Sequence, residues 1–339
     1  MPPESTPVGL TEAGPARRPP DRLPSYAELA HADPPHSAWS IPGIDPRLGM
    51  LSLLDEEAAA NAFRLVRRGK QFRLDAALDL FDPPLFGRSR FVHDVVELDN
   101  IFDEILSGWS TQVSSKWDGF RHVRHPVAGF FGGLAAAEHG VGHWARHGIV
   151  GRGVLVDVAA YRASVGRPLR PDAPDPIEVE DLVEALARTG TTLGRGDVLL
   201  VRTGWLDWYR TLDTVDRIAA ARVEAAVGLR TCGKMIEFLW DQHISAVAAD
   251  NPALEVWPAG ALIEPSVRAA ARTDRGRLSE VFMHFALIPL LGIPIGELWD
   301  LGPLAADCAV DGRYEFLLMS APMPSMTGVA SPPNAIAVK

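Results

Sequence analysis

The chain has 339 residues, of which 47% are hydrophobic and 22% are charged, as in an ordinary globular protein. Its 33 Lys and Arg residues against 43 Asp and Glu residues give a net charge of −10, which excludes a general nucleic-acid binder that needs a positive surface. The two cysteines, Cys232 and Cys308, form no C-x-x-C pair, so a disulfide framework and a Cys-rich zinc site are excluded as well.

The N-terminal region has a different composition from the rest of the chain. Residues 1–35 are rich in Pro, and such a stretch buries too little apolar surface to offset its ordering entropy. We predict a flexible tail over 1–35, which becomes an ordered arm near Tyr26, and a single domain over 36–339. The region has no signal-peptide pattern, and no window has the ~20 apolar residues of a membrane span. We therefore expect a cytoplasmic protein that does not enter a membrane.

Helical and strand patterns then alternate along the chain. A helix is predicted over 54–68, with Asp55 as its cap, because acidic residues open this stretch and arginines close it. The short buried runs 153–158 and 197–202 flank an amphipathic helix over 180–189, which predicts a parallel crossover. These features indicate an α/β fold with one core. The other predicted elements are strands at 74–80, 91–98, 244–249, 314–319 and 335–338, and helical stretches at 135–146, 215–241 and 281–291.

The densest group of polar residues lies between two of these elements, at Gln112, Lys116, Asp118 and His122. They follow one another at steps of four, two and four, so an extended segment would point all four side chains to one face. Gln and Asp oxygens can bind a hard cation, and a neutral His can bind a metal or move a proton. Lys116 cannot ligate a metal while it is protonated. A solvated loop with an ordinary Lys116–Asp118 ion pair fits the same spacing, so spacing alone does not decide.

Several segments resemble those of one known family. The stretch from Gln112 to His122, QVSSKWDGFRH, resembles the motif H-x-G-T-H-x-D-x-P-x-H of the cyclase family that includes bacterial kynurenine formamidase and isatin hydrolase. It is most similar to a longer bacterial branch in which W-D-G follows the second His position. Five more segments in the same order resemble that branch: 151–157, 194–205, 248–251 with Glu255, 296–301 and 328–337.

The resemblance implies a fold and a site. The family fold is a swivelling β/β/α arrangement, a compact barrel-like sheet flanked by helices, and its members form dimers or higher oligomers, so a homodimer or homotetramer is expected. Studied members hydrolyse amides or lactams with Zn²⁺ or Mn²⁺. By the resemblance, Asp118 is the metal-binding carboxylate and His122 the proton-transfer histidine. Gln112 and Lys116 stand where the formamidases have ligating histidines, so the implied metal site is degenerate.

Three functional hypotheses remain open at this point. In the first, a Zn or Mn ion held by Asp118 and Gln112 activates water to hydrolyse an amide, lactam or lactone, with His122 as general acid/base. In the second, no metal is bound, and Lys116 supplies its charge in a biosynthetic cyclisation, dehydration or isomerisation. In the third, the chain is a non-catalytic binding protein. The expected partner is a small-molecule carbonyl substrate.

Further residues are predicted to bind this substrate. Phe130 and Phe131 stand where the related branch has an aromatic-Gly loop, and Trp205 and Trp257 are expected as pocket walls or core residues. His284 stands where the family places a histidine near the pocket. The aromatic surroundings favour a largely apolar or aromatic compound. The predicted substrate-binding set is Trp117, Phe130, Phe131, Trp205, Glu255 and His284.

Overall fold

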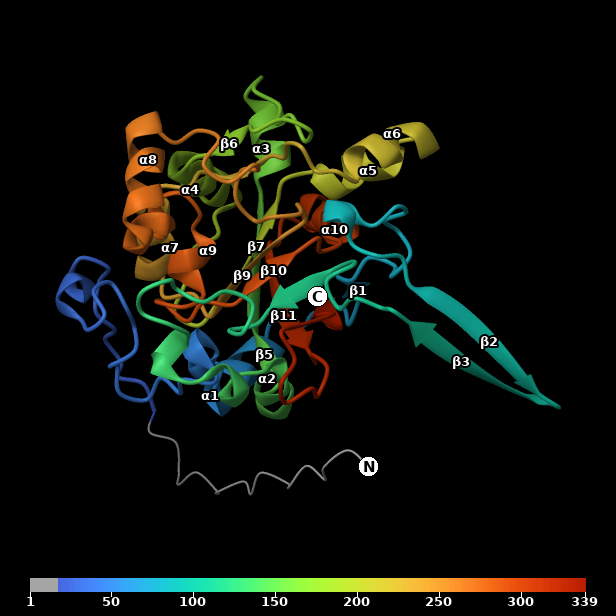
Figure 1. The fold of residues 1–339 in the computed structure, drawn as a ribbon, viewed down its shortest axis with the longest axis horizontal. Coiled ribbons are helices and arrows are strands. Elements are labelled where there is room, and N and C mark those ends of the chain that lie inside the picture. The colour runs from blue at the N-terminus through green and yellow to red at the C-terminus, as the bar shows by residue number, and fades with distance from the viewer. Residues whose placement is uncertain (1–17) are drawn as a thin grey trace.

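The fold is built on one large sheet of nine strands with helices around it (Figure 1). The structure is a computed structural model that describes residues 18–339. The sheet has the strand order β1-β13-β11-β5-β7-β9-β10-β4-β12, and it curls into a half-barrel. The predicted α/β class and the barrel-like sheet flanked by helices are therefore confirmed.

The middle of the sheet is parallel and both of its sides are antiparallel. β5, β7, β9 and β10 run parallel to one another, which confirms the predicted crossover between the strands at 153–158 and 197–202. These strands are almost fully buried, as is typical of parallel strands covered on both faces. The nine strands are β1 Gln71–Arg73, β4 Lys116–Asp118, β5 Ile149–Asp157, β7 Val198–Arg202, β9 Ala246–Ala249, β10 Ile295–Glu297, β11 Glu315–Ser320, β12 Ala330–Ser331 and β13 Ala335–Val338.

Ten α-helices surround the sheet in the described part of the chain. The predicted cap of the first helix is confirmed, because the Asp55 carboxylate accepts a hydrogen bond from the Ala58 backbone N–H at 2.9 Å. The helices are α1 Glu56–Phe63, α2 Val141–His147, α3 Val158–Ser164, α4 Val179–Thr189, α5 Trp205–Thr211, α6 Thr214–Ala220, α7 Gly233–Asp241, α8 Pro265–Thr273, α9 His284–Leu287 and α10 Gly302–Asp311. None of the helices over residues 18–339 is long and apolar enough to cross a membrane.

A two-stranded hairpin projects from the body of the molecule (Figure 1). It consists of β2 Val92–Leu98 and β3 Ile101–Ser107, and every residue of both strands is exposed. The predicted strand at 91–98 is confirmed, but its partner β3 was not anticipated. One face of the hairpin carries five exposed apolar side chains: Val92, Val96, Leu98, Ile101 and Ile105. A second small sheet joins β6 Pro176–Ile177 to β8 Gly228–Leu229.

Four predicted elements differ from the structure. The α-helix expected over 135–146 begins only at Val141, after a separate turn at Ala136–Glu138. The strand predicted at 74–80 is wrong, because this segment crosses the core as a loop and buries Leu74 and Ala76 without forming a strand. The helix predicted over 54–68 stops at Phe63, where the chain continues in turns with hydrogen bonds to carbonyls three residues back. The helix predicted over 281–291 is reduced to α9; Ile288 keeps helical backbone angles, but Pro289 has no backbone N–H to continue the helical hydrogen bonds.

The N-terminal arm packs on the domain. Of the predicted flexible tail, residues 1–17 lie outside the described residues. At the start of the described arm, the Arg18 guanidinium donates to Glu57 of α1 at 2.9 Å. Further along, the arm lies against α7, where the Trp240 indole N–H donates to the Pro24 carbonyl at 2.8 Å and the Tyr26 N–H to Asp241 Oδ1 at 2.7 Å. Leu23 in this arm is buried at 3% exposure. The described part of the arm, from Arg18 onward, therefore packs on the folded body. Both cysteines are free thiols.

Candidate active site

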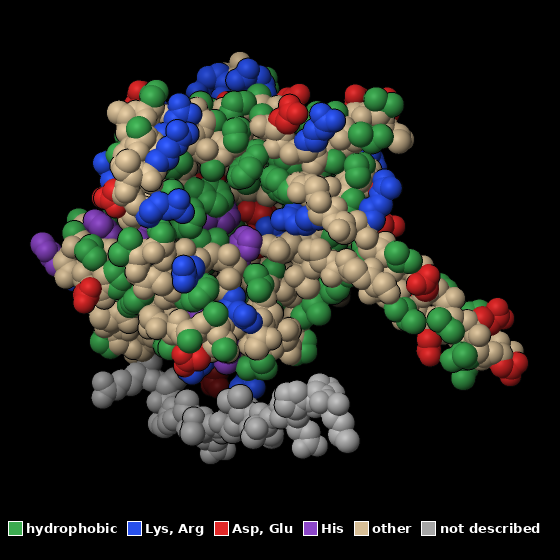
Figure 2. All heavy atoms as spheres, in the orientation of Figure 1, with side chains coloured by type: hydrophobic (Ala, Val, Ile, Leu, Met, Phe, Trp, Pro, Cys, Tyr) green, Lys and Arg blue, Asp and Glu red, His purple; other side chains and the backbone are tan. Residues whose placement is uncertain are grey.

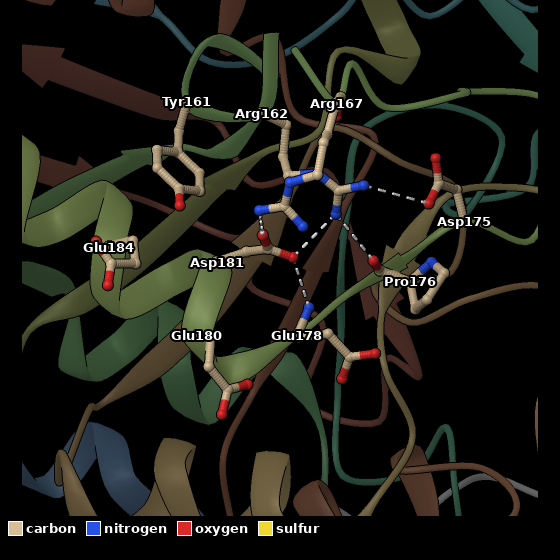
Figure 3. Close-up of a pocket in the computed structure, with 9 residues that line it drawn as sticks. All are labelled: Tyr161, Arg162, Arg167, Asp175, Pro176, Glu178, Glu180, Asp181 and Glu184. Carbon is tan, nitrogen blue, oxygen red and sulfur yellow. Dashed lines mark hydrogen bonds and ion pairs between the residues drawn. The ribbon is translucent and has the colours of Figure 1, made fainter. Parts of the chain in front are cut away.

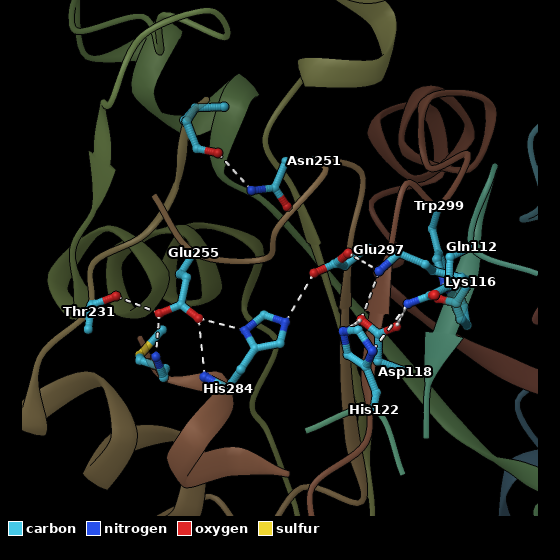
Figure 4. Close-up of polar contacts among 12 residues, drawn as sticks. Gln112, Lys116, Asp118, His122, Thr231, Asn251, Glu255, His284, Glu297 and Trp299 are labelled. Atoms are coloured by element: carbon cyan, nitrogen blue, oxygen red, sulfur yellow. Dashed lines mark hydrogen bonds and ion pairs between the residues drawn. The ribbon is translucent and has the colours of Figure 1, made fainter. Parts of the chain in front are cut away.

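The short strand β4 places Lys116 and Asp118 on one face of the sheet. Successive side chains of a strand point to opposite faces, so Lys116 and Asp118 share a face and Trp117 points to the other. Lys116 Nζ donates to Asp118 Oδ2 at 2.8 Å and forms a second ion pair with Glu297 Oε2 (Figure 4). Glu297 reaches this position because β10 pairs antiparallel with β4 and sets Glu297 directly opposite Lys116. The ammonium therefore lies between two carboxylates.

These three charges are shielded from solvent. The side chains of Lys116 and Glu297 are each 3% exposed and that of Asp118 is 0% exposed. Burial favours the neutral form of Lys116, but the charges of Asp118 and Glu297 outweigh it and raise the pKa of Lys116. Burial acts against the Asp118 carboxylate too, yet Lys116 and the nearby histidines hold the pKa of Asp118 below its usual range. Lys116 is a cation and Asp118 an anion across the physiological pH range.

His122 and Gln112 complete this side of the site. The Gln112 amide donates to Asp118 Oδ1 at 3.3 Å and lies 3.2 Å from His122 Nδ1, while His122 Nε2 is 3.8 Å from Asp118 Oδ2. The side chain of His122 is 30% exposed, far more than those of Lys116 and Asp118. Burial lowers the pKa of His122, and the Asp118 charge only partly opposes this. His122 is thus a neutral imidazole that solvent or a ligand can reach.

A second buried group continues from Glu297. His284 Nε2 lies 3.2 Å from Glu297 Oε1, and His284 Nδ1 lies 2.7 Å from Glu255 Oε1 (Figure 4). Glu255 also accepts hydrogen bonds from Thr231 Oγ1 at 2.5 Å and from the Met283 N–H at 2.6 Å. Burial lowers the pKa of His284, but its hydrogen bonds to Glu255 and Glu297 outweigh burial and raise that pKa to about 9. At neutral pH His284 is therefore an imidazolium.

Three residues of the cluster are candidates to bind a metal ion. Ligand atoms of Asp118, His284 and Glu297 lie within 4.8 Å of one another, which makes them a candidate metal site by distance. Their chemistry does not fit a bound cation in this arrangement. Lys116 already contacts both carboxylates, and both nitrogens of His284 point to carboxylates and carry protons, so neither has a lone pair free for a metal.

The aromatic residues predicted to line the pocket have other surroundings. Trp117 is 0% exposed and packs edge-on against Trp299, with ring centroids 4.7 Å apart. Trp205 is 1% exposed and stacks on Tyr209, and Phe131 is 1% exposed and packs on Phe120. These three rings belong to the core, and for Trp117 the reason is its position on the opposite face of β4. Phe130 is half-buried, with its ring 6.1 Å from that of His139.

A different set of aromatic rings borders the polar cluster. The Phe282 ring stacks on the His284 ring at 4.2 Å, Trp257 packs edge-on against Phe282 at 6.3 Å, and Phe86 packs edge-on against Trp257 at 5.4 Å. Figure 2 shows a hollow near the centre of one face, with acidic and histidine side chains at its base and apolar side chains around it. Of these three residues the sequence pointed only to Trp257, as a pocket wall or core residue. Phe86 and Phe282 were not anticipated, because the three come from segments far apart in the sequence.

A separate cavity of about 520 Å³ lies beside α3 and α4 (Figure 3). Its charged groups satisfy one another, since Arg162 donates to Asp181 at 3.0 Å and Asp181 also accepts the Glu178 N–H at 3.1 Å. Asp181 is thereby part of the cap of α4. The arrangement is that of a structural ion-pair network, and we assign no function to this cavity.

The curled sheet and the buried acid–base cluster at the edge of its parallel region define an α/β protein with a polar centre under an aromatic wall. The chain belongs to the putative cyclase family, whose family model matches residues 75–256. Among curated proteins none matches the chain.

Solved structures support this assignment. A crystal structure described as a novel cyclase is similar at 28% identity with a TM-score of 0.70, covering 88% of this chain and 97% of that one. Isatin hydrolase A from Labrenzia aggregata, bound to benzyl benzoate, shares 17% identity with a TM-score of 0.51, covering 84% and 98%. An isatin hydrolase bound to the product analogue thioisatinate shares 13% identity with a TM-score of 0.53, covering 84% and 98%. At this distance the two isatin hydrolases show a common fold.

Proposed function

We propose that the chain is an enzyme that acts on the carbonyl group of a small, largely apolar molecule without a metal ion, and that Lys116 supplies the positive charge of the site. The observation that carries the proposal is the position of Lys116 Nζ, which contacts Asp118 Oδ2 at 2.8 Å and also pairs with Glu297. A cation is thus already fixed between the two carboxylates, in a place that solvent does not enter.

Lys116 is suited to stabilise an anion that forms on a substrate oxygen. An ammonium has three protons, and the two carboxylates engage two of them, so the third has no partner among the described residues. A donor held in a dry site is worth most where negative charge develops, as on an enolate or a tetrahedral oxyanion. Asp118 and Glu297 keep the ammonium in place and keep it protonated.

His122 is suited to move the proton. It is neutral near pH 7, so it can accept a proton from a substrate carbon or hydroxyl, and the Asp118 carboxylate 3.8 Å away stabilises the imidazolium that results. The same imidazolium can return the proton to a leaving group or another carbon. An enolate next to a lysine and a proton carrier suits cyclisation, dehydration or isomerisation of a carbonyl compound.

The competing proposal is metal-dependent hydrolysis of an amide, lactam or lactone, with Asp118 as a ligand. It is supported by the three ligand atoms within 4.8 Å and by the isatin hydrolases that share the fold. It requires Lys116 to leave both carboxylates and His284 to lose a proton that two glutamates hold. We therefore favour the lysine-based site.

Elemental analysis of protein purified without chelator tests the proposal. We expect substoichiometric zinc and manganese, and turnover of carbonyl compounds that a chelator does not reduce. Stoichiometric zinc or manganese that leaves together with activity would refute the lysine-based site and establish the hydrolase. A third result would leave a binding protein: wild type turns over no carbonyl compound, and His122→Asn is indistinguishable from wild type in every assay.

A further inference from the structure

Arg88 is a partly buried cation that forms no ion pair with any residue in the described range 18–339. Its Nη1 atom is buried, and no residue between 18 and 339 accepts a hydrogen bond from it. Burial lowers the pKa of Arg88, and the carboxylates of Glu297 and Asp118 are the charges that oppose this, which places Arg88 beside the site. Both carboxylates are engaged by Lys116, so neither serves as a direct partner for Arg88.

Other partly buried arginines have hydrogen-bond partners within the fold. Arg121, Arg217 and Arg313 each donate to a backbone carbonyl. Three more bond a carboxylate directly, as expected when a charge is taken out of water. The pairs are Arg162 with Asp181 at 3.0 Å, Arg202 with Asp157 at 2.8 Å and Arg210 with Asp300 at 2.7 Å. In contrast to these arginines, Arg88 has a buried guanidinium nitrogen with no partner in the described part of the chain. Its hydrogen-bonding capacity is therefore left for a ligand.

The aromatic wall connects Arg88 to the acid–base cluster. The Arg88 guanidinium lies over the Phe86 ring at 5.2 Å, and Phe86 packs against Trp257, which packs against Phe282 next to His284. Phe86 has a φ of 59°, in the left-handed region that a phenylalanine rarely adopts, and its N–H donates to the Ala221 carbonyl at 2.8 Å. Such backbone geometry costs free energy and is concentrated at functional sites.

We propose that Arg88 binds a carboxylate of the substrate, so that the site takes an aromatic or otherwise planar carbonyl compound that carries a carboxylate. This inference rests on the proposed function, since it assigns the substrate class of the same site. A planar guanidinium presents two parallel N–H groups that match a carboxylate, and the wall formed by Phe86, Trp257 and Phe282 offers rings for the apolar part. Lys116 and His122 then act on the carbonyl.

A pair of matched probes tests the assignment by binding alone. We would measure the Kd of 2-aminobenzoate and of its neutral counterpart 2-aminobenzamide by calorimetry on the wild-type chain, Arg88→Gln and Arg90→Gln. Arg90 is the control, since it is exposed and paired with Asp82 at 2.5 Å on the protein surface. We expect wild type and Arg90→Gln to bind the acid at least about tenfold more tightly than the amide, and Arg88→Gln to lose this preference. Circular dichroism of Arg88→Gln verifies that it folds.

Three results would overturn the inference: equal Kd values for acid and amide in wild type, a preference that survives in Arg88→Gln, or no binding of the acid in the millimolar range. The test does not depend on turnover or on metal content. If wild type proves to hold stoichiometric zinc, the lysine-based function fails while the Arg88-dependent preference stands or falls on its own measurement. If the preference is absent and the chain is metal-free, the substrate class fails and the lysine-based site remains.

Discussion

Lys116 and Glu297 lie directly opposite each other on the antiparallel strands β4 and β10, and their side chains form an ion pair that solvent does not reach. A cross-strand pair is normally an exposed contact of small energy. Here Asp118 binds the same ammonium, so one lysine pairs with two buried carboxylates. The stability and the chemistry of the site therefore depend on the same side chain.

Removing the lysine should be costly. In Lys116→Met, the buried Asp118 carboxylate loses the cation that it contacts and Glu297 keeps only His284, and breaking a buried ion pair in this way costs about 3–5 kcal/mol. We expect a loss of this size in the free energy of unfolding, measured by urea titration at pH 7. The control is Lys234→Met, because Lys234 pairs with Glu180 on the exposed surface, where such pairs contribute less than about 1 kcal/mol. Equal losses in the two variants would contradict this account.

Restoring a histidine should create a metal site. Lys116→His removes the ammonium and adds a neutral nitrogen ligand beside Asp118 and Glu297, which gives the three protein ligands that a zinc ion requires. We expect one zinc ion per chain in calorimetric titration of this variant, a Tm that rises with added zinc, and neither effect in wild type. Lys116→Gln is the control, because it removes the charge without adding the ring. Zinc binding of similar affinity in wild type would show that the lysine does not exclude the metal.

His122 should titrate below its ordinary range. Its pKa is lowered by burial, so the neutral ring predominates above pH 6.5 and the protonated ring forms only in more acidic solution. Because the neutral ring is the base, turnover should be constant near neutral pH and fall on the acid side of about pH 6.5. The NMR shift of the His122 ring protons, assigned by their absence from His122→Asn, gives the pKa directly. A pKa above 6.5 would disprove the assignment of His122 as the neutral proton acceptor.

The part of the site formed by residues 112–122 can largely be predicted from the sequence. The even spacing of Gln112, Lys116, Asp118 and His122 would place all four side chains on one face of an extended segment. The structure brings the four together, although only Lys116–Asp118 is a strand and His122 lies in a turn. Glu297 could not be assigned, since it reaches Lys116 only through a strand register that joins segments about 180 residues apart. Spacing alone does not tell which face of β4 is packed in the core, so Trp117 was assigned to the pocket. In the structure it packs against Trp144 and Trp299.

The His284 pair should make stability depend on pH in a specific direction. The pKa of His284 is raised to about 9 in the folded chain from an ordinary value of 6.5. The stability that its proton contributes is therefore fully present below pH 6.5 and is lost as the pH rises through about 9. We expect the free energy of unfolding to fall between pH 6.5 and 9 in wild type.

The matched variant for this effect is Glu255→Gln, which removes the charge that contacts His284 Nδ1 while keeping the side chain's shape. Its stability should be lower than that of wild type at pH 6.5, and the two curves should converge toward pH 9. Urea titrations at four pH values measure both curves. Parallel curves would mean that His284 does not bind its proton more tightly in the folded chain.

The order of charges in the site determines how far its electric field extends. Glu255, His284, Glu297, Lys116 and Asp118 alternate in sign along one path, and Arg88 adds the positive charge that makes acids and bases equal in number. Fields of alternating, balanced charges cancel within a few ångströms, so the centre does not draw ions in from solution. Capture of a charged substrate would depend on contact once it has entered, and the site itself should add little to the dependence of the association rate on ionic strength that the chain's net charge of −10 produces.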